Sequence, residues 1–216
     1  MRENIKVYTN RAEFGNTMLR KYISKAPNRI VSDIGAGFGH MKKHVVAIKA
    51  TYQAFDYVKK IEEATIWNLN NSAPQNIKKP GIVILLEVLE HLDNPLLGIQ
   101  NIAEHIEKNG ILILTTPNPQ SSKNTLSLFL RGALYAFQEK HLVENHVFTP
   151  WKHVVYEFLE RSGFEVIEYA IVDIQYKNNK GETFKDWLKA KLESFIEYRN
   201  PLAKGMSYGI VARKIE

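Results

Sequence analysis

Apolar segments of strand length alternate with segments of helical periodicity along most of this chain of 216 residues. Such alternation predicts an α/β fold, in which helices cover both faces of a mostly parallel sheet. The length suffices for one large domain with a substantial core, and we expect a single domain. We predict strands at residues 29–35, 50–56, 64–70, 81–87, 111–117, 164–172 and 207–214, and helices at 10–25, 40–48, 95–106, 125–137, 151–163 and 181–200.

The charges are unevenly distributed. The net charge is +6, and residues 1–29 hold seven Lys or Arg against two Asp or Glu, while residues 177–216 hold nine against five. Basic flanks can attract anionic partners such as nucleic acid, phosphorylated substrates or a membrane surface, and they are also typical of ordinary solvated helix faces. The sequence contains no cysteine, which excludes disulfides, thiolate metal sites and a thiol nucleophile.

No apolar run approaches the roughly 18 residues that a membrane-spanning helix needs. The N-terminal residues MRENIKVYTNRAEF also lack the apolar segment of a signal peptide. We therefore expect a soluble, cytoplasmic protein.

The most apolar strand ends in a group of ionisable residues. Residues 82–92 read IVILLEVLEHL, so Glu87, Glu90 and His91 follow a strand suited to the centre of the sheet. Burying unpaired charge there would be costly. These side chains therefore either reach solvent or have a molecule or ion bound to them.

A glycine-rich turn follows the first central strand. The residues VSDIGAGFG (31–39) have the spacing D-x-G-x-G-x-G, with Asp33 two residues before Gly35. A nicotinamide cofactor site would require a glycine where His40 stands. Glycines at such a turn let a ligand approach the backbone closely.

The acids around this turn indicate the character of the ligand. Asp33 would repel a pyrophosphate and suits a ligand with an ammonium group and no phosphate, a description that fits S-adenosylmethionine. Asp56 ends the next strand, 17 residues after Gly39. An acid in that position accepts hydrogen bonds from ribose hydroxyls in dinucleotide-binding folds.

At this point the sequence resembles the class I S-adenosylmethionine-dependent methyltransferases. The resemblance covers residues 29–172 and the last strand, and its motifs stand in order: DIGAGFG (33–39), AFD (54–56), WNLN (67–70), EVLEHLDNP (87–95), ILTTPN (113–118) and HVFTP (146–150).

The resemblance implies a Rossmann-like, doubly wound sheet of seven strands whose last strand is antiparallel. It also implies the cofactor-binding residues: Asp33, Gly35, Ala36, Gly37 and Gly39 for the methionine part, Asp56 for the ribose, Asn68 and Leu69 for the adenine, and Glu87 at the methionine end. Two positions depart from the family pattern. Gly81 stands where relatives often carry Asp before the fourth strand, and Asn68 stands where they often have Asp.

The E-V-L-E-H motif resembles a subset that includes ubiquinone-pathway O-methyltransferases and small-RNA 3′-terminal 2′-O-methyltransferases. The latter bind a divalent metal through two Glu, the adjacent His and a later His. The corresponding residues here are Glu87, Glu90, His91 and His146, and Asn145 replaces an acid that precedes the later His. Carboxylates with imidazole suit Mg²⁺, Mn²⁺ or Zn²⁺.

Two alternatives to a metal site stay open. Without a metal, His91 or His146 would act as a general base toward an acceptor hydroxyl, with Glu90 beside them. In a purely structural role, Glu90 and His91 would bond backbone groups of the turn. His141 could take the place of His146 in either active role, while His40, His44, His105 and His153 suit surface or packing positions.

The acceptor side is expected to comprise the N-terminal helical appendage (1–29), the connection 118–150 and a helical insertion, 173–206. Helix 125–137 could line the acceptor pocket, contact a membrane interface or pack on the sheet, and helix 181–200 could form a lid or a homodimer contact. We predict an O-methyltransferase acting on a hydroxyl of a small molecule, such as a sugar, glycan precursor or quinone-like phenol. The alternatives are an RNA-modifying methyltransferase, although nucleic acid is the less favoured partner, and an inactive S-adenosylmethionine-binding regulatory protein.

Overall fold

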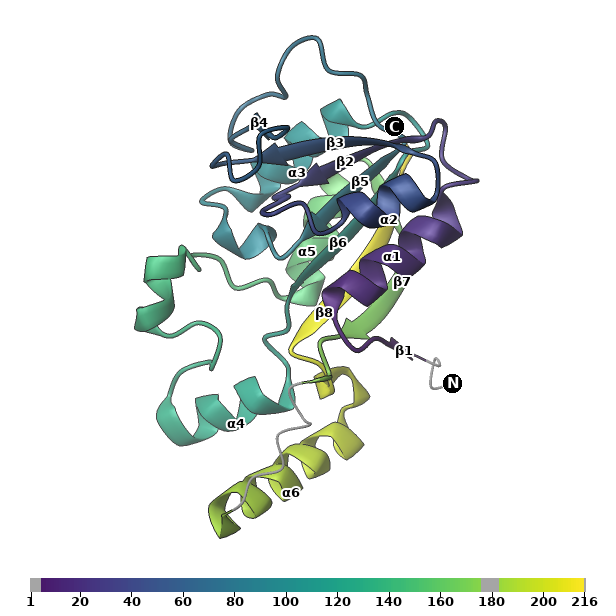
Figure 1. Ribbon diagram of the computed structural model, residues 1–216. Coiled ribbons are helices and arrows are strands. Elements are labelled where there is room, and N and C mark those ends of the chain that lie inside the picture. Colours follow the sequence, from purple (N-terminus) through teal and green to yellow (C-terminus); the bar gives the residue numbers. More distant parts are fainter. Residues whose placement is uncertain (1–4, 176–182, 216) are drawn as a thin grey trace.

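The centre of the molecule is one eight-stranded sheet (Figure 1). The computed structural model describes residues 5–175 and 183–215. The strands are β1 (Lys6–Val7), β2 (Ile30–Ile34), β3 (Thr51–Asp56), β4 (Thr65–Ile66), β5 (Ile82–Leu86), β6 (Ile111–Pro117), β7 (Phe164–Val172) and β8 (Ser207–Lys214). Their spatial order is β1-β7-β8-β6-β5-β2-β3-β4.

Strand β8 is antiparallel to its neighbours β6 and β7, and the other pairs of adjacent strands are parallel. The predicted mostly parallel sheet with an antiparallel last strand is confirmed. The expected number of seven strands is wrong, because Lys6 and Val7 pair with Ala170 and Ile171 and add β1 at the edge.

Helices cover both faces of the sheet. The α-helices are α1 (Arg11–Tyr22), α2 (Lys42–Ala47), α3 (Pro95–His105), α4 (Ser122–Arg131), α5 (Lys152–Arg161) and α6 (Phe184–Arg199). Short 3₁₀ helices are η1 (Leu89–His91), η2 (Glu139–Glu144) and η4 (Pro201–Ala203). Helices α1 and α2 pack on one face, α3 and α5 on the other, and α4 and α6 lie beyond one end of the strands (Figure 1). None of the helices in the described residues is long and apolar enough to cross a membrane.

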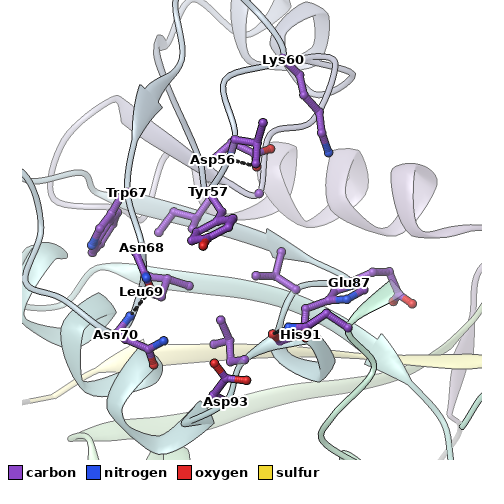
Figure 2. Close-up of a pocket in the computed structure, with 16 residues that line it drawn as sticks. Asp56, Tyr57, Lys60, Trp67, Asn68, Leu69, Asn70, Glu87, His91 and Asp93 are labelled. Carbon is purple, nitrogen blue, oxygen red and sulfur yellow. Dashed lines mark hydrogen bonds between the residues drawn. The ribbon is translucent and has the colours of Figure 1, made fainter. Parts of the chain in front are cut away.

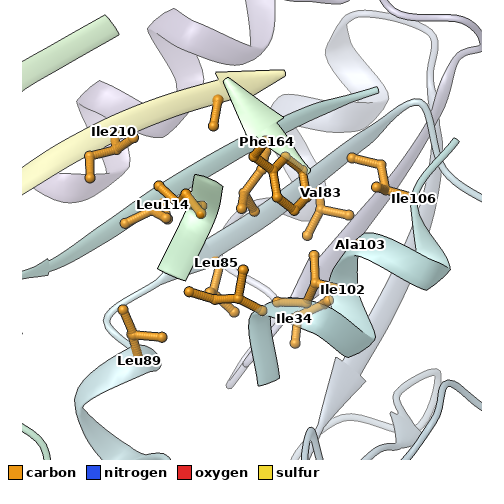
Figure 3. Packing of buried hydrophobic residues seen from close by; sticks show 14 of the residues in the cluster. Ile34, Val83, Leu85, Leu89, Ile102, Ala103, Ile106, Leu114, Phe164 and Ile210 are labelled. Carbon is orange, nitrogen blue, oxygen red and sulfur yellow. The ribbon is translucent and has the colours of Figure 1, made fainter. Parts of the chain in front are cut away.

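The central strands contribute side chains to two separate apolar cores. Along β5, Val83 and Leu85 join the core under α3 and α5, while Ile82 and Ile84 join the core under α1 and α2. This alternation follows from the two-residue period of a strand. Figure 3 shows the first of these cores, where Leu114 and Ile210 also lie. Burial on both faces explains why these strands read as continuous apolar runs in the sequence.

Helix α1 approaches the sheet closely at one glycine. A Cβ atom added to Gly209 in β8 would lie 2.5 Å from Cζ of Phe14. The Phe14 ring therefore fills the volume that any other residue at position 209 would need. Helix α1 begins after Asn10, whose side chain accepts a hydrogen bond from the Glu13 backbone N–H.

Two predicted elements have wrong boundaries. The strand expected at 64–70 is only two residues long, because the Asn68 side chain accepts a hydrogen bond from Asn70 N and forms a turn. The helix expected at 125–137 begins at Ser122, where Ser121 caps it, and ends at Arg131, where Gly132 adopts a left-handed conformation with φ +71°. Helix α6 confirms the helix expected at 181–200, although residues 1–4 and 176–182 of the predicted appendage and insertion lie outside the described residues.

His105 provides a pH-dependent contribution to stability. Its Nε2 atom lies 3.0 Å from Ser32 Oγ, and its ring packs against Phe55 and Trp67. Burial lowers the pKa of His105 from 6.5 to about 4. Between pH 4 and pH 6.5 the unfolded chain binds a proton at His105 that the folded chain excludes. The contribution of the neutral, buried His105 to the free energy of unfolding is therefore complete above pH 6.5 and declines as the pH falls toward 4.

We expect the difference in unfolding free energy between wild type and His105→Gln to shrink as the pH is lowered through this window. Urea denaturation at several pH values measures it. The exposed His153→Gln variant should show no such trend, and a pH-independent difference for His105→Gln would contradict the assignment.

Candidate functional site

The glycine turn after β2 is shaped for close approach to the backbone. Gly35, Gly37 and Gly39 all have positive φ angles, of 74°, 54° and 72°. A Cβ atom on Gly35 would lie 2.3 Å from the Val88 side chain, so packing requires the glycine there. A Cβ atom on Gly37 would meet nothing within 4 Å. The turn therefore has open space beside Gly37.

Asp56 at the end of β3 faces this turn. Its Oδ2 atom accepts a hydrogen bond from Gly37 N at 2.8 Å, and Oδ1 accepts one from Val58 N at 3.2 Å. A carboxylate has about four acceptor sites. Two backbone donors thus fix its orientation and leave capacity for two more donors.

A cavity of about 600 Å³ lies at the carboxyl ends of β2, β3 and β5 (Figure 2). This is where open α/β sheets bind ligands. The cavity brings together six of the predicted residues: Gly35, Asp56, Asn68, Leu69, Glu87 and His91. Its other lining residues are Ile34, Tyr57, Val58, Lys60, Trp67, Asn70, Val88, Leu92, Asp93 and Asn145.

Asp33 is buried and is not among the residues that line this cavity. Its Oδ2 atom accepts a hydrogen bond of 2.8 Å from the Tyr52 hydroxyl. Burial raises the pKa of Asp33 to about 6. Ala36, Gly37 and Gly39 also do not line the cavity as it stands. Contacts of these four residues with a ligand stay a prediction.

Glu87 combines an unusual backbone conformation with an incompletely paired carboxylate. Its φ angle is +54°, which is uncommon for a residue other than glycine. Its Oε2 atom accepts a hydrogen bond of 3.1 Å from Ser207 Oγ and lies 3.7 Å from Nη1 of Arg11. Its Oε1 atom is buried and makes no well-aligned hydrogen bond in the described residues, while the Thr115 and Ser207 hydroxyls stabilise the charged carboxylate. Burial raises the pKa of Glu87 to about 7, although the Arg11 guanidinium opposes this shift.

Three of the four predicted metal ligands form one cluster. Ligand atoms of Glu90, His91 and His146 all lie within 4.8 Å of one another, and Glu87 does not belong to this group. Oε1 of Glu90 lies 3.8 Å from Nε2 of His91, and the two histidine rings are 4.7 Å apart between centroids. Glu90 is buried, and its Oε2 atom accepts a hydrogen bond from Thr116 Oγ1 at 3.1 Å. Burial and the neighbouring Glu87 raise the pKa of Glu90.

The backbone holds the distant His146 beside the strand end. The Glu90 carbonyl accepts hydrogen bonds from Val147 N and Phe148 N, at 3.1 and 3.2 Å. Asn145, with φ +57°, donates from Nδ2 to the His91 carbonyl at 2.7 Å. Asn145 therefore connects the two segments of the cluster. Its amide can donate this hydrogen bond, which a carboxylate in the same position could not.

The other histidines lie outside this cluster. The His141 ring centroid is 5.8 Å from that of His146, and its Nδ1 atom accepts a hydrogen bond from Gln138 N. The arrangement favours His146 over His141 as the third residue of the cluster.

The family described as "Methyltransferase domain" matches residues 10–169. The chain belongs to this family, the class I S-adenosylmethionine-dependent methyltransferases. The donor implied by the family fits the observed site, since Asp56 and Glu87 place carboxylates at the cavity, Asp56 has spare acceptor capacity, and the adjoining turn has open space beside Gly37.

Curated relatives of this methyltransferase include enzymes with different substrates. It is 27% identical over 150 residues to the ubiquinone biosynthesis O-methyltransferase of Rickettsia canadensis, covering 64% of this chain and 63% of the relative. It is also 27% identical over 213 residues to the tRNA U34 carboxymethyltransferase of Histophilus somni, covering 88% of this chain and 61% of the relative. The chain thus spans only about three fifths of each relative's length.

A solved structure confirms the fold of the methyltransferase. A S-adenosylmethionine-dependent methyltransferase from Archaeoglobus fulgidus superposes with a TM-score of 0.61 at 18% identity, covering 94% of each chain. At this identity the likeness establishes the fold alone.

Some residues of the site were not foreseen from the sequence. Tyr57 and Lys60 line the cavity just after the ribose-type acid, and Arg11 reaches Glu87 from the N-terminal helix. The position of Tyr57, directly after a strand-terminal acid, is a usable signal. No sequence signal marks Arg11, because its position depends on the packing of α1 against the sheet.

Proposed function

We propose that this methyltransferase transfers the methyl group of S-adenosylmethionine to a hydroxyl oxygen of a small-molecule acceptor. One observation carries the proposal: His91 lines the donor cavity and also belongs to the cluster with Glu90 and His146. A group that can accept or displace a hydroxyl proton thus lies at the boundary of the donor site. This is the arrangement that O-methylation needs.

The donor would be oriented by charges on both sides of the cavity. Asp56 has acceptor capacity for the ribose hydroxyls. The Glu87 carboxylate lines the same cavity, has one buried oxygen without a well-aligned hydrogen bond in the described residues, and would accept a hydrogen bond from the ammonium of the methionine part. Such a charge-assisted bond offsets the cost of leaving this oxygen buried.

We further propose that Glu90, His91 and His146 bind a divalent cation. One carboxylate and two imidazoles provide a mixed oxygen and nitrogen donor set suited to Mg²⁺, Mn²⁺ or Zn²⁺. A cation held there would lower the pKa of the acceptor hydroxyl. The residues themselves would fix the acceptor beside the donor methyl group and exclude water, so that catalysis rests on positioning and charge stabilisation.

Removal of the cation provides the test. Treatment with a chelator, followed by transfer into metal-free buffer, should lower kcat roughly tenfold or more. Mutating the residues that orient metal ligands typically costs roughly 10- to 100-fold in activity, and loss of the cation should cost at least as much. Adding Mg²⁺, Mn²⁺ or Zn²⁺ should restore activity, while donor binding measured by calorimetry should not change. Glu90→Gln keeps the shape of the side chain and should lose the response to metal. Unchanged turnover after chelation would leave His91 as a metal-free general base.

The acceptor class rests on the resemblance to the ubiquinone biosynthesis enzyme, which favours a quinone-like phenol, and sugars or glycan precursors belong to the same hydroxyl-bearing class. A screen of such acceptors with isotopically labelled donor, with and without divalent metal, tests the function. If the donor binds but no hydroxyl acceptor becomes labelled, the chain would instead be a donor-binding regulatory protein.

The similarity to a tRNA-modifying enzyme over most of this chain favours a second candidate, action on RNA. The basic flanking segments are consistent with it. Binding of bulk tRNA that weakens steeply with salt, together with transfer of label to RNA, would favour this candidate over the small-molecule acceptor.

A further inference from the structure

Helix α6 exposes a continuous apolar face. Six large apolar side chains on it are exposed: Phe184, Trp187, Leu188, Leu192, Phe195 and Tyr198. Successive members are mostly three or four residues apart, so they share one side of the helix. Phe184 and Tyr198 are each 76% exposed, which is unusual for side chains of this size. We call these six residues the α6 apolar face.

The opposite side of α6 faces α4. The buried Ser122 hydroxyl donates a hydrogen bond of 2.7 Å to Oε1 of Glu197. Figure 1 shows both helices beyond the end of the sheet, away from the layers formed by α1, α2 and α3. Helix α6 is therefore attached along one side, and among the described residues its other side is exposed.

The α6 apolar face is accompanied by positive charge. Lys185, Lys189, Lys191 and Arg199 are exposed on the helix. Three acids also lie on α6. Glu197 is buried, and Oε1 of Glu193 lies 3.9 Å from Nζ of Lys189. Asp186 accepts a hydrogen bond from the Thr183 hydroxyl. The solvent-facing part of α6 is thus aromatic, and its exposed basic side chains outnumber its exposed acids.

Exposed aromatic and basic side chains on one helix suit the headgroup region of an anionic lipid bilayer. Aromatic side chains of Trp and Tyr favour the boundary between lipid headgroups and acyl chains, and lysine and arginine attract anionic headgroups. We propose that α6 docks on an anionic lipid bilayer and inserts its apolar face into this boundary, with the helix parallel to the membrane plane. Lysine and arginine side chains within or beside such a face can extend to the headgroups while the apolar side chains insert.

The basic side chains of α6 favour an anionic bilayer over a second copy of the chain as its partner. In a two-fold dimer through this face, the same basic side chains would approach their own copies. An anionic bilayer instead neutralises each of them. The proposal also differs from the sequence expectation, which named membrane contact as one of three alternatives for residues 125–137. Helix α4 ends at Arg131, and the longer exposed apolar stripe lies on α6.

Co-sedimentation of the full chain with lipid vesicles tests the proposal. The chain should bind vesicles of phosphatidylcholine with phosphatidylglycerol and should bind pure phosphatidylcholine much more weakly. Trp187→Glu and Phe195→Glu should each weaken binding roughly tenfold or more, as expected from losing one buried aromatic side chain. Val46→Glu, at an exposed apolar position on α2, is the matched control and should bind like wild type.

Tryptophan fluorescence gives a second readout that does not depend on charge-introducing variants. Of the three tryptophans, Trp187 is exposed, Trp151 is half-buried and Trp67 is buried, so insertion of α6 should shift the Trp187 emission to shorter wavelength. Trp187→Phe keeps the apolar face and should bind vesicles without this shift. Higher salt should weaken binding, because it screens the headgroup charges.

Three outcomes would overturn the proposal. The first is a lack of binding to anionic vesicles. The second is binding that Trp187→Glu and Phe195→Glu leave unchanged. The third is a concentration-dependent dimer that these substitutions dissociate, in a chain that does not bind lipid. None of these results depends on methyl transfer.

Discussion

Replacing Asp56 with alanine is expected to weaken binding of S-adenosylmethionine roughly 100-fold, because two hydrogen bonds to a charged group contribute on the order of 3 kcal/mol together. In the structure, the Asp56 carboxylate is oriented by the backbone N–H groups of Gly37 and Val58. The variant would lose both this support of the turn and the acceptors for the ribose. Isothermal titration calorimetry with the donor, and with its demethylated product, measures the change.

Two further variants separate ligand binding from folding. Asp56→Asn keeps one acceptor oxygen and should show an intermediate loss of affinity. Glu62→Ala removes an exposed acid on the segment after β3 and should bind the donor like wild type. If Asp56→Ala melts at the wild-type temperature and still binds the donor with unchanged affinity, the ribose role is refuted.

Replacing His91 with alanine is expected to reduce kcat by roughly 100- to 10,000-fold, the range associated with loss of a proton-transferring group. His91 lies 3.8 Å from the Glu90 carboxylate and adjoins His146, so its removal breaks the cluster under either mechanism. Donor affinity should change little, because the principal donor contacts proposed above belong to Asp56 and Glu87. Single-turnover kinetics with labelled donor, alongside calorimetry, measures both quantities.

His153→Ala is the matched control, since this histidine is exposed on α5. His141→Ala tests the neighbouring imidazole and should retain most activity, because His141 lies outside the cluster. Substantial turnover by His91→Ala would remove His91 from the mechanism, and loss of activity in His141→Ala alone would exchange the roles of the two histidines.

The order of strands and helices was predictable because it depends on local patterns. The apolar runs of β2, β5 and β6 and the capped helix α3 are visible in the sequence, since burial on both faces demands them. The ends of the helices and strands depended on single residues, which the apolar periodicity does not reveal. Asn68 ends β4 early, and Gly132 ends α4. The pairing of β1 with β7 could not be foreseen, because it joins residues far apart in the sequence.

The candidate site was predictable in its residue types and only partly in its geometry. The motifs grouped Gly35, Asp56 and His91 in one site, and the structure brings all three to one cavity. They grouped Glu87 with Glu90, although the left-handed backbone of Glu87 separates it from the metal-type cluster. Side-chain direction at a strand end depends on such backbone angles, which residue spacing does not reveal.

The close contact between Phe14 and Gly209 has a consequence for how the site is assembled. Strand β8 provides both the bare backbone on which α1 rests and Ser207, which donates to Glu87. Arg11, at the start of α1, reaches the same carboxylate. The Glu87 carboxylate, proposed above as a donor contact, can therefore gain its full set of partners only after β8 has inserted between β6 and β7, so a ribosome-bound chain that has not yet released β8 would present this carboxylate without Ser207 and without the surface that seats Arg11.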